Sequence, residues 1–416
     1  MALEIRPYTQ EEAEAFRRVP AIVFGNYREP LPPVEQDGTG IIPEWSLCAF
    51  EDGVLATTYG AFPLVVRLNG RKAPMAGVTF VGTLPEFRRR GHLRKIMETD
   101  FRRRYEQRME PIAGLLASIA AIYQRFGYAV CSISLRASID PRWVRFVPSV
   151  PAAEGRWREA SPDELPLLER IYRQFSGLRN GYLHRAPAIW SGQVLARGGN
   201  MFGGFDVGPS LVAVYEEAGE PRGYVAWGAR HFDVPPFNDG GGPGQRVSVR
   251  DYAWLTPTAY RAIWEYLRNF DLAARIWINS MPPDDPAPHV LLDPRELYLT
   301  ARDHLLGRII DVERALPLRP YGEDGRVVLD VRDDMCPWNA GRWALEAGSD
   351  GASVARTDES PQLSLDVSAL AQLLFGQVSP TRAVRYGRAE ASPDAPLVRF
   401  DAMFRTEYAP FCPDMF

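Results

Sequence analysis

Residues 81–93, Val-Gly-Thr-Leu-Pro-Glu-Phe-Arg-Arg-Arg-Gly-His-Leu, decide the fold of the N-terminal part of this chain. They begin in an apolar run that stops at Pro85, a residue that ends strands. From residue 93 to residue 105, apolar side chains then recur every three or four positions, which is the spacing of one helix face. The sequence therefore predicts a strand, a turn over Arg88–Gly91 and a helix.

The turn has the chemistry of an anion site. The first N–H groups of a helix lack intrahelical partners, and the helix dipole favours negative charge there. Gly91 lets the backbone approach a phosphate closely, and Arg88 and Arg89 add charge-assisted donors. The alternative is a solvated arginine run at a helix start, but cations at that end oppose the dipole. The pattern favours a diphosphate site.

Several elements surround this turn in an order typical of a mixed α+β domain. Hairpin turns at residues 51–53 and at Asn69-Gly70 join antiparallel strands before it. After it we expect a buried strand over residues 112–117, a short helix over 119–126 and an edge strand over 130–135. We assign residues 1–145 to this first domain.

The second segment, residues 146–298, repeats the layout of a hairpin, a strand and a helix but has no Arg-x-x-Gly turn. The elements predicted in it are strands over 211–215, 224–227 and 247–255, a surface loop over Pro235–Gly244, and a helix over 260–267. We interpret this segment as a degenerate internal repeat of the first domain.

The third segment, residues 299–416, has no chemical motif in its interior. Strands over 327–331 and 363–367 and a helix over 368–375 are expected in it. Its last residues, Ala409–Phe416, are unusually apolar for a chain end, which normally frays. We therefore predict that this tail is tied down.

Two motifs carry a resemblance to a known family. Arg88–Leu93 is similar to Arg-x-x-Gly-x-Gly/Ala, the acetyl-CoA signature of the GNAT superfamily, except that Leu93 replaces the last small residue. Phe80–Arg94 resembles the Eis (enhanced intracellular survival) motif Phe-Val-x-Val-x-Pro-x-x-Arg-Arg-Arg-Gly-Leu-Leu-Arg, and Ile122–Tyr128 resembles that family's Ile-Tyr-x-Arg-Phe-Gly-Tyr. Over the whole chain, the resemblance implies two tandem GNAT-like domains, the second degenerate, and a sterol-carrier-like α/β domain.

The resemblance also implies an acetyl-CoA site. Backbone groups of Val81 and Thr83 would pair with the pantetheine arm, and the arginine turn would hold the phosphates. The residues implied for acetyl-CoA are Val81, Thr83, Arg88, Arg89, Arg90, Gly91, Leu93, Arg94 and Ser118.

The same resemblance implies two catalytic groups. Tyr123 would protonate the thiolate leaving group, and the α-carboxylate of Phe416 would act as the base. The alternatives are that Tyr123 only packs on the sheet and that Phe416 only anchors the chain end. Residues 119–121, Ile-Ala-Ala, depart from the Glu-Gly-Gly of the family, which leaves the acceptor pocket open.

Composition limits the function classes. The formal net charge of −4 argues against a nucleic-acid-binding protein and suits cationic acceptors. No apolar run reaches the roughly 18 residues of a membrane span, so we expect the protein in the cytoplasm. The four scattered cysteines and the histidines do not have metal-ligand spacing, so we expect an enzyme without a metal. The resemblance implies acetylation of amines such as aminoglycosides by a closed homo-oligomer, a hexamer. The alternatives are a lipid- or partner-binding protein with a vestigial GNAT domain, and a protein N-acetyltransferase.

Overall fold

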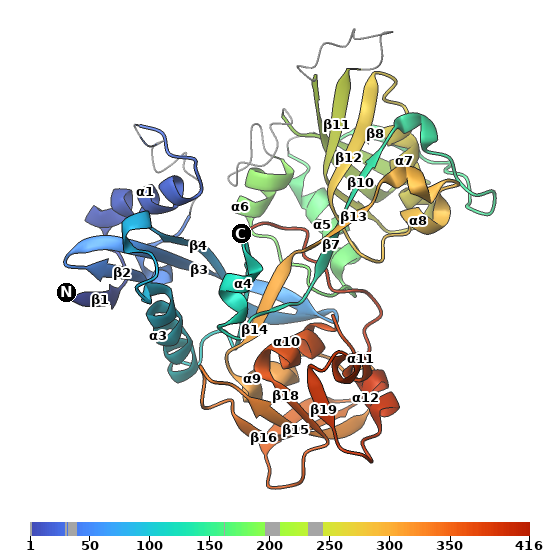
Figure 1. Ribbon diagram of the computed structural model, residues 1–416. Coiled ribbons are helices and arrows are strands. Elements are labelled where there is room, and N and C mark those ends of the chain that lie inside the picture. Colours follow the sequence, from blue (N-terminus) through green and yellow to red (C-terminus); the bar gives the residue numbers. More distant parts are fainter. Residues whose placement is uncertain (1, 30, 32–39, 162, 196–208, 232–243) are drawn as a thin grey trace. The chain divides into compact units, whose positions relative to one another are not determined.

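A computed structural model describes residues 2–29, 31, 40–161, 163–195, 209–231 and 244–416 (Figure 1). The chain forms two units, of which unit 1 comprises Met1–Ser132, Asp303–Pro410 and Phe416, and unit 2 comprises Ile133–Arg302 and Phe411–Met415. Residues 235–243 of the predicted surface loop lie outside the described residues.

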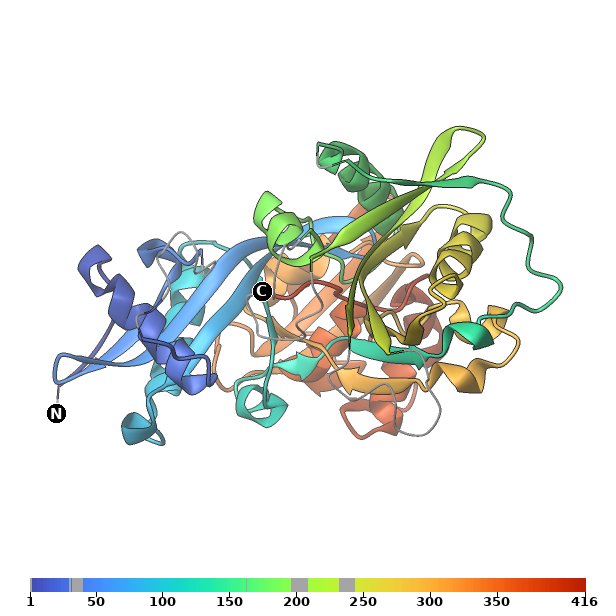
Figure 2. The same cartoon turned by 90° about the horizontal axis from the view of Figure 1, so that it is seen from above.

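The first sheet of unit 1 has seven strands within the described residues. In spatial order these are β1 (Leu3–Arg6), β2 (Cys48–Glu51), β3 (Val54–Leu68), β4 (Arg71–Thr83), β5 (Ile112–Leu116), β14 (Leu305–Ile309) and β6 (Ala129–Val130). The long strands β3 and β4 lie side by side in both Figure 1 and Figure 2, in agreement with their antiparallel pairing. Their hairpin turns at Asn69-Gly70, where both residues have positive φ, as the sequence predicts.

Helices α1 (Ala13–Val23), α3 (His92–Glu106) and α4 (Ala120–Gln124) accompany this sheet. The predicted apolar face of α3 is confirmed at Ile96, Met97 and Phe101, which are fully buried in one core with sheet residues of β5, but it is wrong at Tyr105, which is 38% exposed. Truncating a buried phenylalanine such as Phe101 typically costs about 3–5 kcal/mol. The rigid packing of α3 fixes the turn that precedes it.

Where the structure describes the chain, unit 1 also contains a five-stranded sheet built from the C-terminal part. Its strands, in spatial order, are β17 (Gly351–Arg356), β16 (Gly341–Gly348), β15 (Gly325–Arg332), β18 (Leu363–Asp366) and β19 (Ala389–Ala391). Helices α9 (Val312–Ala315), α10 (Val367–Phe375), α11 (Pro380–Arg385) and α12 (Leu397–Met403) accompany it. Helix α10 ends at Gly376 in the left-handed conformation and contacts β14 of the first sheet.

The sheet of unit 2 has seven strands in the part of the chain that the structure describes. They are β13 (Thr300–Asp303), β7 (Ile133–Ile139), β12 (Ala273–Met281), β11 (Gln245–Trp254), β10 (Glu220–His231), β9 (Leu211–Glu217) and β8 (Arg156–Glu159). The described residues of this unit also form the helices α5 (Leu165–Ser176), α6 (Pro187–Ile189), α7 (Pro257–Arg268) and α8 (Ala287–Val290). The antiparallel β9–β10–β11 run followed by α7 and the parallel β12 repeats the β2–β3–β4–α3–β5 layout of unit 1.

The single edge strand predicted over residues 130–135 is wrong. The chain forms β6 at Ala129–Val130 and then β7 at Ile133–Ile139, and these two strands belong to different sheets. Between them the N–H groups of Cys131 and Ser132 bond to the carbonyl of Leu305 rather than extending one ladder. The alternating pattern of these residues could not show that two distant segments compete for them.

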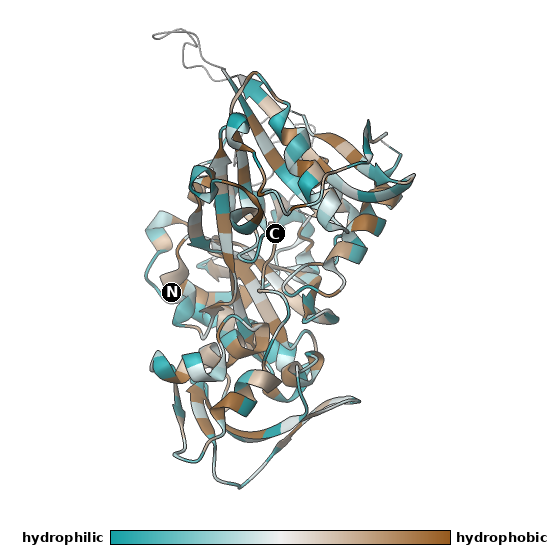
Figure 3. Cartoon of the chain, turned by 90° about the vertical axis from the view of Figure 1, so that its right-hand side faces the viewer, coloured by the Kyte–Doolittle hydropathy of each residue, from teal (hydrophilic) through white to brown (hydrophobic). Residues whose placement is uncertain are grey.

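Hydrophobic bands recur along the strands and helices and alternate with hydrophilic ones (Figure 3). This alternation is expected for elements that each turn one face to a core. Among the described residues, no helix is long and apolar enough to cross a membrane.

Candidate active site

Strands β4 and β5 pair over only part of their length. Their parallel pairing ends at Val78 opposite Leu115, although β4 continues to Thr83. At Phe80 the backbone is left-handed, with φ of 51°, and the pairing of β4 with β3 shifts register beside it. Such a bulge bends a strand and re-aims its backbone groups. In the described residues, the β5-facing edge of β4 beyond Val78 is therefore without a strand partner.

The turn after β4 contains two left-handed residues, Arg89 with φ of 65° and Gly91 with φ of 84°. Gly91 caps α3 without a side chain, and a β-carbon added to it would meet no atom within 4 Å. The first hydrogen bond of α3 joins the N–H of Lys95 to the carbonyl of Gly91 at 3.2 Å. The N–H groups of residues 92–94 precede that bond and have no acceptor among the described residues, so they can bind an anion.

Four arginines around this turn are exposed, and three of them, Arg88, Arg89 and Arg94, have no buried ion-pair partner among the described residues. The Nε of Arg88 donates to the carbonyl of Thr83 at 3.1 Å, which holds this side chain beside the end of β4. Arg94 forms a surface pair with Glu98 at 3.4 Å. Exposed pairs of this kind are typically worth about 1 kcal/mol or less, so a bound phosphate can compete for the guanidinium groups. Arg88, Arg89 and Arg94 are thus available to an anion at the turn.

Arg90 and His92 are instead bound to Glu51, a buried residue at the end of β2. One carboxylate oxygen of Glu51 accepts from Arg90, and the other lies 2.8 Å from Nε2 of His92. Nδ1 of His92 lies 3.3 Å from Oγ1 of Thr57, and Arg90 also donates to the carbonyl of Glu86 at 2.7 Å. These contacts fasten the turn to the sheet.

Sequence reasoning missed Glu51 and His92. The available signal was that His92 stands where the Eis motif has leucine, a change that places a polar ring under the turn. Of the other predicted acetyl-CoA residues, Val81 and Leu93 pack against the core below α3. Ser118 is exposed after the end of β5.

Tyr123 lies on the short helix α4, and its ring packs edge-to-face on Tyr128 with centroids 6.0 Å apart. The side chain is half-buried, and this burial raises the pKa of Tyr123 to about 12. The phenol therefore stays protonated at neutral pH, the state that an acid requires. Gly127, which ends this segment with φ of 82°, would place a β-carbon 2.8 Å from the guanidinium of the buried Arg308. Only glycine fits both the turn and this contact.

The chain end is tied down, as predicted. Phe416 is 6% exposed, and a β-carbon added to Gly77 would lie 3.0 Å from Cδ2 of its ring. Gly77 is the residue of β4 just before Val78, where the pairing with β5 ends. The terminal ring therefore lies at the start of the opening between these two strands.

Unit 2 has no comparable anion site at α7. Oγ1 of Thr256 accepts the N–H of Ala259 at 3.0 Å and thereby caps the helix. The carboxylate of Glu217 accepts from the hydroxyls of Thr256 and Thr258. The protein's own anion already occupies this helix start, consistent with a degenerate domain.

Comparison with known proteins agrees with this arrangement. Acetyltransferase (GNAT) domain models match residues 4–131 and 181–309, and a sterol carrier protein domain model matches residues 312–413. The chain is 33% identical over 427 aligned residues, 100% of both chains, to an uncharacterized N-acetyltransferase of Streptomyces coelicolor. It is 30% identical to N-acetyltransferase Eis of Mycobacterium tuberculosis over 342 residues, 80% of this chain and 79% of that protein.

The chain belongs to the Eis family of N-acetyltransferases. Among solved structures, Eis1 of Mycobacterium abscessus matches with a TM-score of 0.79 at 27% identity, with both chains fully covered. A GCN5-related N-acetyltransferase of Anabaena variabilis has a TM-score of 0.85 at 23% identity, again over both whole chains, which shows the shared fold. The Eis family architecture of two GNAT domains and a sterol carrier domain is thus confirmed, and the chain is an acetyltransferase.

Proposed function

We propose that this enzyme transfers the acetyl group of acetyl-CoA to an amine of a cationic small molecule such as an aminoglycoside. The observation that carries the donor assignment is the turn at Arg88–Gly91. It combines a side-chain-free helix cap, free N–H groups at residues 92–94 and exposed arginines. These groups suit a diphosphate and a further phosphate. The edge of β4 at Val81 and Thr83, which has no β5 partner beyond Val78, suits the amide groups of a pantetheine arm.

Two groups of unit 1 suit the chemistry. As the amine nitrogen bonds to the acetyl carbon and the carbon–sulfur bond breaks, Tyr123 donates its proton to the leaving sulfur. The Phe416 carboxylate takes the proton that the nitrogen loses, directly or through water. The ammonium has already lost one proton to solvent before the attack, and the proton that the carboxylate takes passes through water to the Tyr123 phenolate, so the net reaction converts an ammonium and a thioester into an amide, a thiol and one proton. An ordinary α-carboxylate has a pKa of about 3.5, so a base of this kind needs the desolvated surroundings that a buried terminal residue such as Phe416 offers.

The acceptor class rests on charge. A chain of net charge −4 attracts cations over its surface, and a polyamine presents several amines to one site. We further propose that the reaction takes place in the cytoplasm and that the enzyme is a hexamer. Light scattering at micromolar protein should give the mass of six chains, and a monomer would overturn the assembly.

The donor assignment is tested by calorimetry with acetyl-CoA. Gly91→Asp places a negative charge at the helix cap, where its side chain has open space and where aspartate adopts the left-handed conformation more readily than most residues. Repulsion between this charge and the phosphates should weaken acetyl-CoA binding about tenfold or more, which corresponds to a loss of about 1.4 kcal/mol or more in binding free energy. Gly91→Asn is the matched neutral control, since asparagine tolerates the left-handed conformation, and it should bind nearly as well as the wild type. Equal affinity of both variants would show that the phosphates bind elsewhere.

The acceptor is tested by turnover with a panel of an aminoglycoside, a linear polyamine and a peptide with a free α-amine. The proposal requires the multiply charged small molecules to be acetylated with the highest kcat/KM. Preference for the peptide would overturn the acceptor class while leaving the donor assignment intact.

A further inference from the structure

The last residues before Phe416 occupy a buried slot of unit 2. Phe411, Cys412 and Asp414 are each at most 2% exposed. The N–H of Phe411 donates to the carbonyl of Asn180 at 2.9 Å. At Gly181, φ is +85°, and a β-carbon there would lie 2.8 Å from the backbone of Phe411. The slot is therefore shaped for this backbone.

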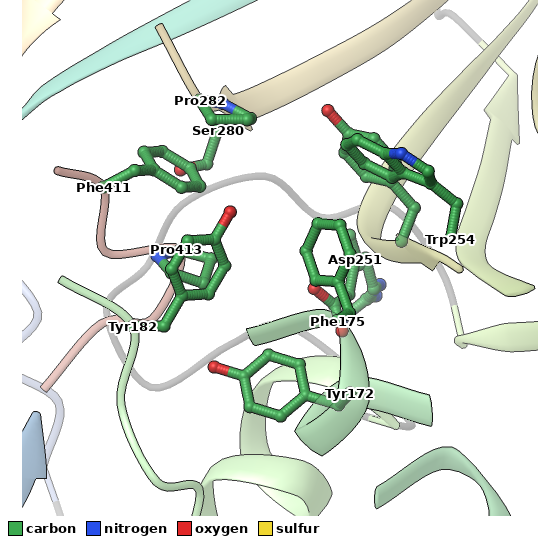
Figure 4. Close-up of a pocket in the computed structure, with 11 residues that line it drawn as sticks. Tyr172, Phe175, Tyr182, Asp251, Trp254, Ser280, Pro282, Phe411 and Pro413 are labelled. Carbon is green, nitrogen blue, oxygen red and sulfur yellow. The ribbon is translucent and has the colours of Figure 1, made fainter. Parts of the chain in front are cut away.

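Aromatic side chains line the slot on one side and the tail lines it on the other. Figure 4 shows Phe411 and Pro413 facing Tyr182, with Tyr172 and Phe175 nearby. The space left between them is about 20 Å³, about enough for one water molecule. The tail itself thus fills this part of the core, which leaves no room for a small-molecule ligand.

A buried arginine holds the side chain of Asp414. The Nε of Arg185 donates to Oδ1 of Asp414 at 2.8 Å, and its other nitrogens donate to Asp251 at 2.6 and 3.0 Å. The guanidinium carbon lies 3.8 Å from the ring centre of Tyr172 and 4.9 Å from that of Trp190. Because the ring contacts and both carboxylates constrain Arg185, its position fixes that of Asp414.

A glutamine holds the backbone of the next residue. Oε1 of Gln193 accepts the N–H of Met415 at 2.9 Å, and Nε2 of Gln193 donates to the carbonyl of Met415. Two bonds to one residue set the rotation of its peptide groups as a strand partner would. Gln193 lies in a widened helical turn in which the N–H of Leu195 bonds to the carbonyl of Trp190, five residues back. Turns of this kind occur frequently at functional sites.

We propose that Gln193 and Arg185 are positioning residues that hold Asp414 and Met415 and thereby place the carboxylate of Phe416 for catalysis. The inference rests on the proposed role of that carboxylate. The two bonds of Gln193 end one residue before the terminus, so a tail that lost them would move its carboxylate by ångströms. A displacement of about 1 Å can cost about 10²-fold in rate.

The test combines two readouts on purified full-length enzyme. The first is removal of Phe416 by a carboxypeptidase, followed by mass spectrometry, which reports whether the tail is held. The second is steady-state kinetics. Gln193→Ala removes both bonds at a half-buried position and should leave the fold intact. Gln174→Ala on the exposed side of α5 is the matched control, and Arg185→Lys is a second variant that keeps the charge but cannot reach both carboxylates.

We expect Phe416 to be removed at least tenfold faster from Gln193→Ala than from the wild type or Gln174→Ala. Its kcat should fall about tenfold to a hundredfold, with an unchanged KM for acetyl-CoA, and Arg185→Lys should change both readouts in the same direction. A tail that stays protected in Gln193→Ala overturns the positioning role, whatever the chemistry. A tail that is released while kcat stays at the wild-type value shows instead that the carboxylate is not catalytic, and the positioning role falls with the proposed base.

Discussion

The ring of Phe416 lies against Gly77, where a β-carbon would approach Cδ2 of the ring to 3.0 Å. Gly77 pairs with Gly114 of β5, one residue before the pairing of the two strands ends. The last residue of the chain therefore lies where β4 and β5 begin to separate. This placement is the basis for the catalytic role that we propose for the α-carboxylate.

Replacing Tyr123 with phenylalanine should lower kcat about 10²-fold or more, the usual contribution of a positioned acid. Affinity for acetyl-CoA should stay near the wild-type value, because in the proposed mechanism the phenol contacts only the reacting sulfur. Burial raises the pKa of Tyr123 to about 12, so the protonated acid persists as the pH rises. The kcat of the wild type should therefore show no fall from this group below about pH 10. A variant with wild-type kcat would assign Tyr123 to packing alone.

Replacing Glu51 with glutamine should weaken acetyl-CoA binding several-fold with little change in kcat. The carboxylate binds both Arg90 and His92, so its loss frees the turn that presents the N–H groups of residues 92–94. Glu86→Gln is the matched control, because Glu86 lies in the same turn but contributes its carbonyl rather than its exposed side chain. Calorimetry that finds the two variants equal would remove Glu51 from the site.

The tail ion pair predicts a specific pH dependence. Burial, with a smaller contribution from Asp251, raises the pKa of Asp414 to about 6 although Arg185 opposes the shift. An unfolded aspartate has a pKa of about 3.9, so the folded protein binds this proton more tightly between about pH 4 and pH 6. The stabilisation from Asp414 is therefore complete below about pH 4 and is lost as the pH rises through about 6.

Asp414→Asn removes that titration. The Tm of the wild type minus the Tm of the variant, measured by scanning calorimetry at each pH, should fall from about pH 4 to about pH 6 and stay constant above. A difference that instead grows with pH over this window would mean that Arg185 lowers the pKa of Asp414 and dominates its environment.

Local patterns predicted much of the fold. The Asn69-Gly70 turn and the three- and four-residue spacing in α3 specify the hairpin and the helix without any distant contact. The insertion of β14 between β5 and β6 could not be predicted in this way. It depends on the pairing of residues 305–309 with residues 112–116, and an apolar run in a sequence does not specify which strand it pairs with.

The same difference between local patterns and long-range contacts applies to the candidate site. The turn at Arg88–Gly91 can be predicted from the sequence alone, because arginines before a glycine at a helix start are chemically unusual. Arg185 and Gln193 have no such signal, since each is an ordinary polar residue until the tail, more than 200 positions later in the sequence, is brought to it. Long-range contacts of this kind become visible only in three dimensions.

The most direct test of the account is the turnover number at saturating acetyl-CoA for wild type, Phe416→Ala and a chain lacking Phe416. Deletion moves the α-carboxylate back by one residue, about 3.3 Å in an extended chain, whereas Phe416→Ala keeps it at position 416. Deletion should lower kcat about 10²-fold or more, Phe416→Ala should lower it less, and the affinity for acetyl-CoA should stay near the wild-type value in both. Equal turnover of the chain lacking Phe416 and the wild type would contradict a catalytic role for the Phe416 carboxylate and would assign the role of the base to another group or to water.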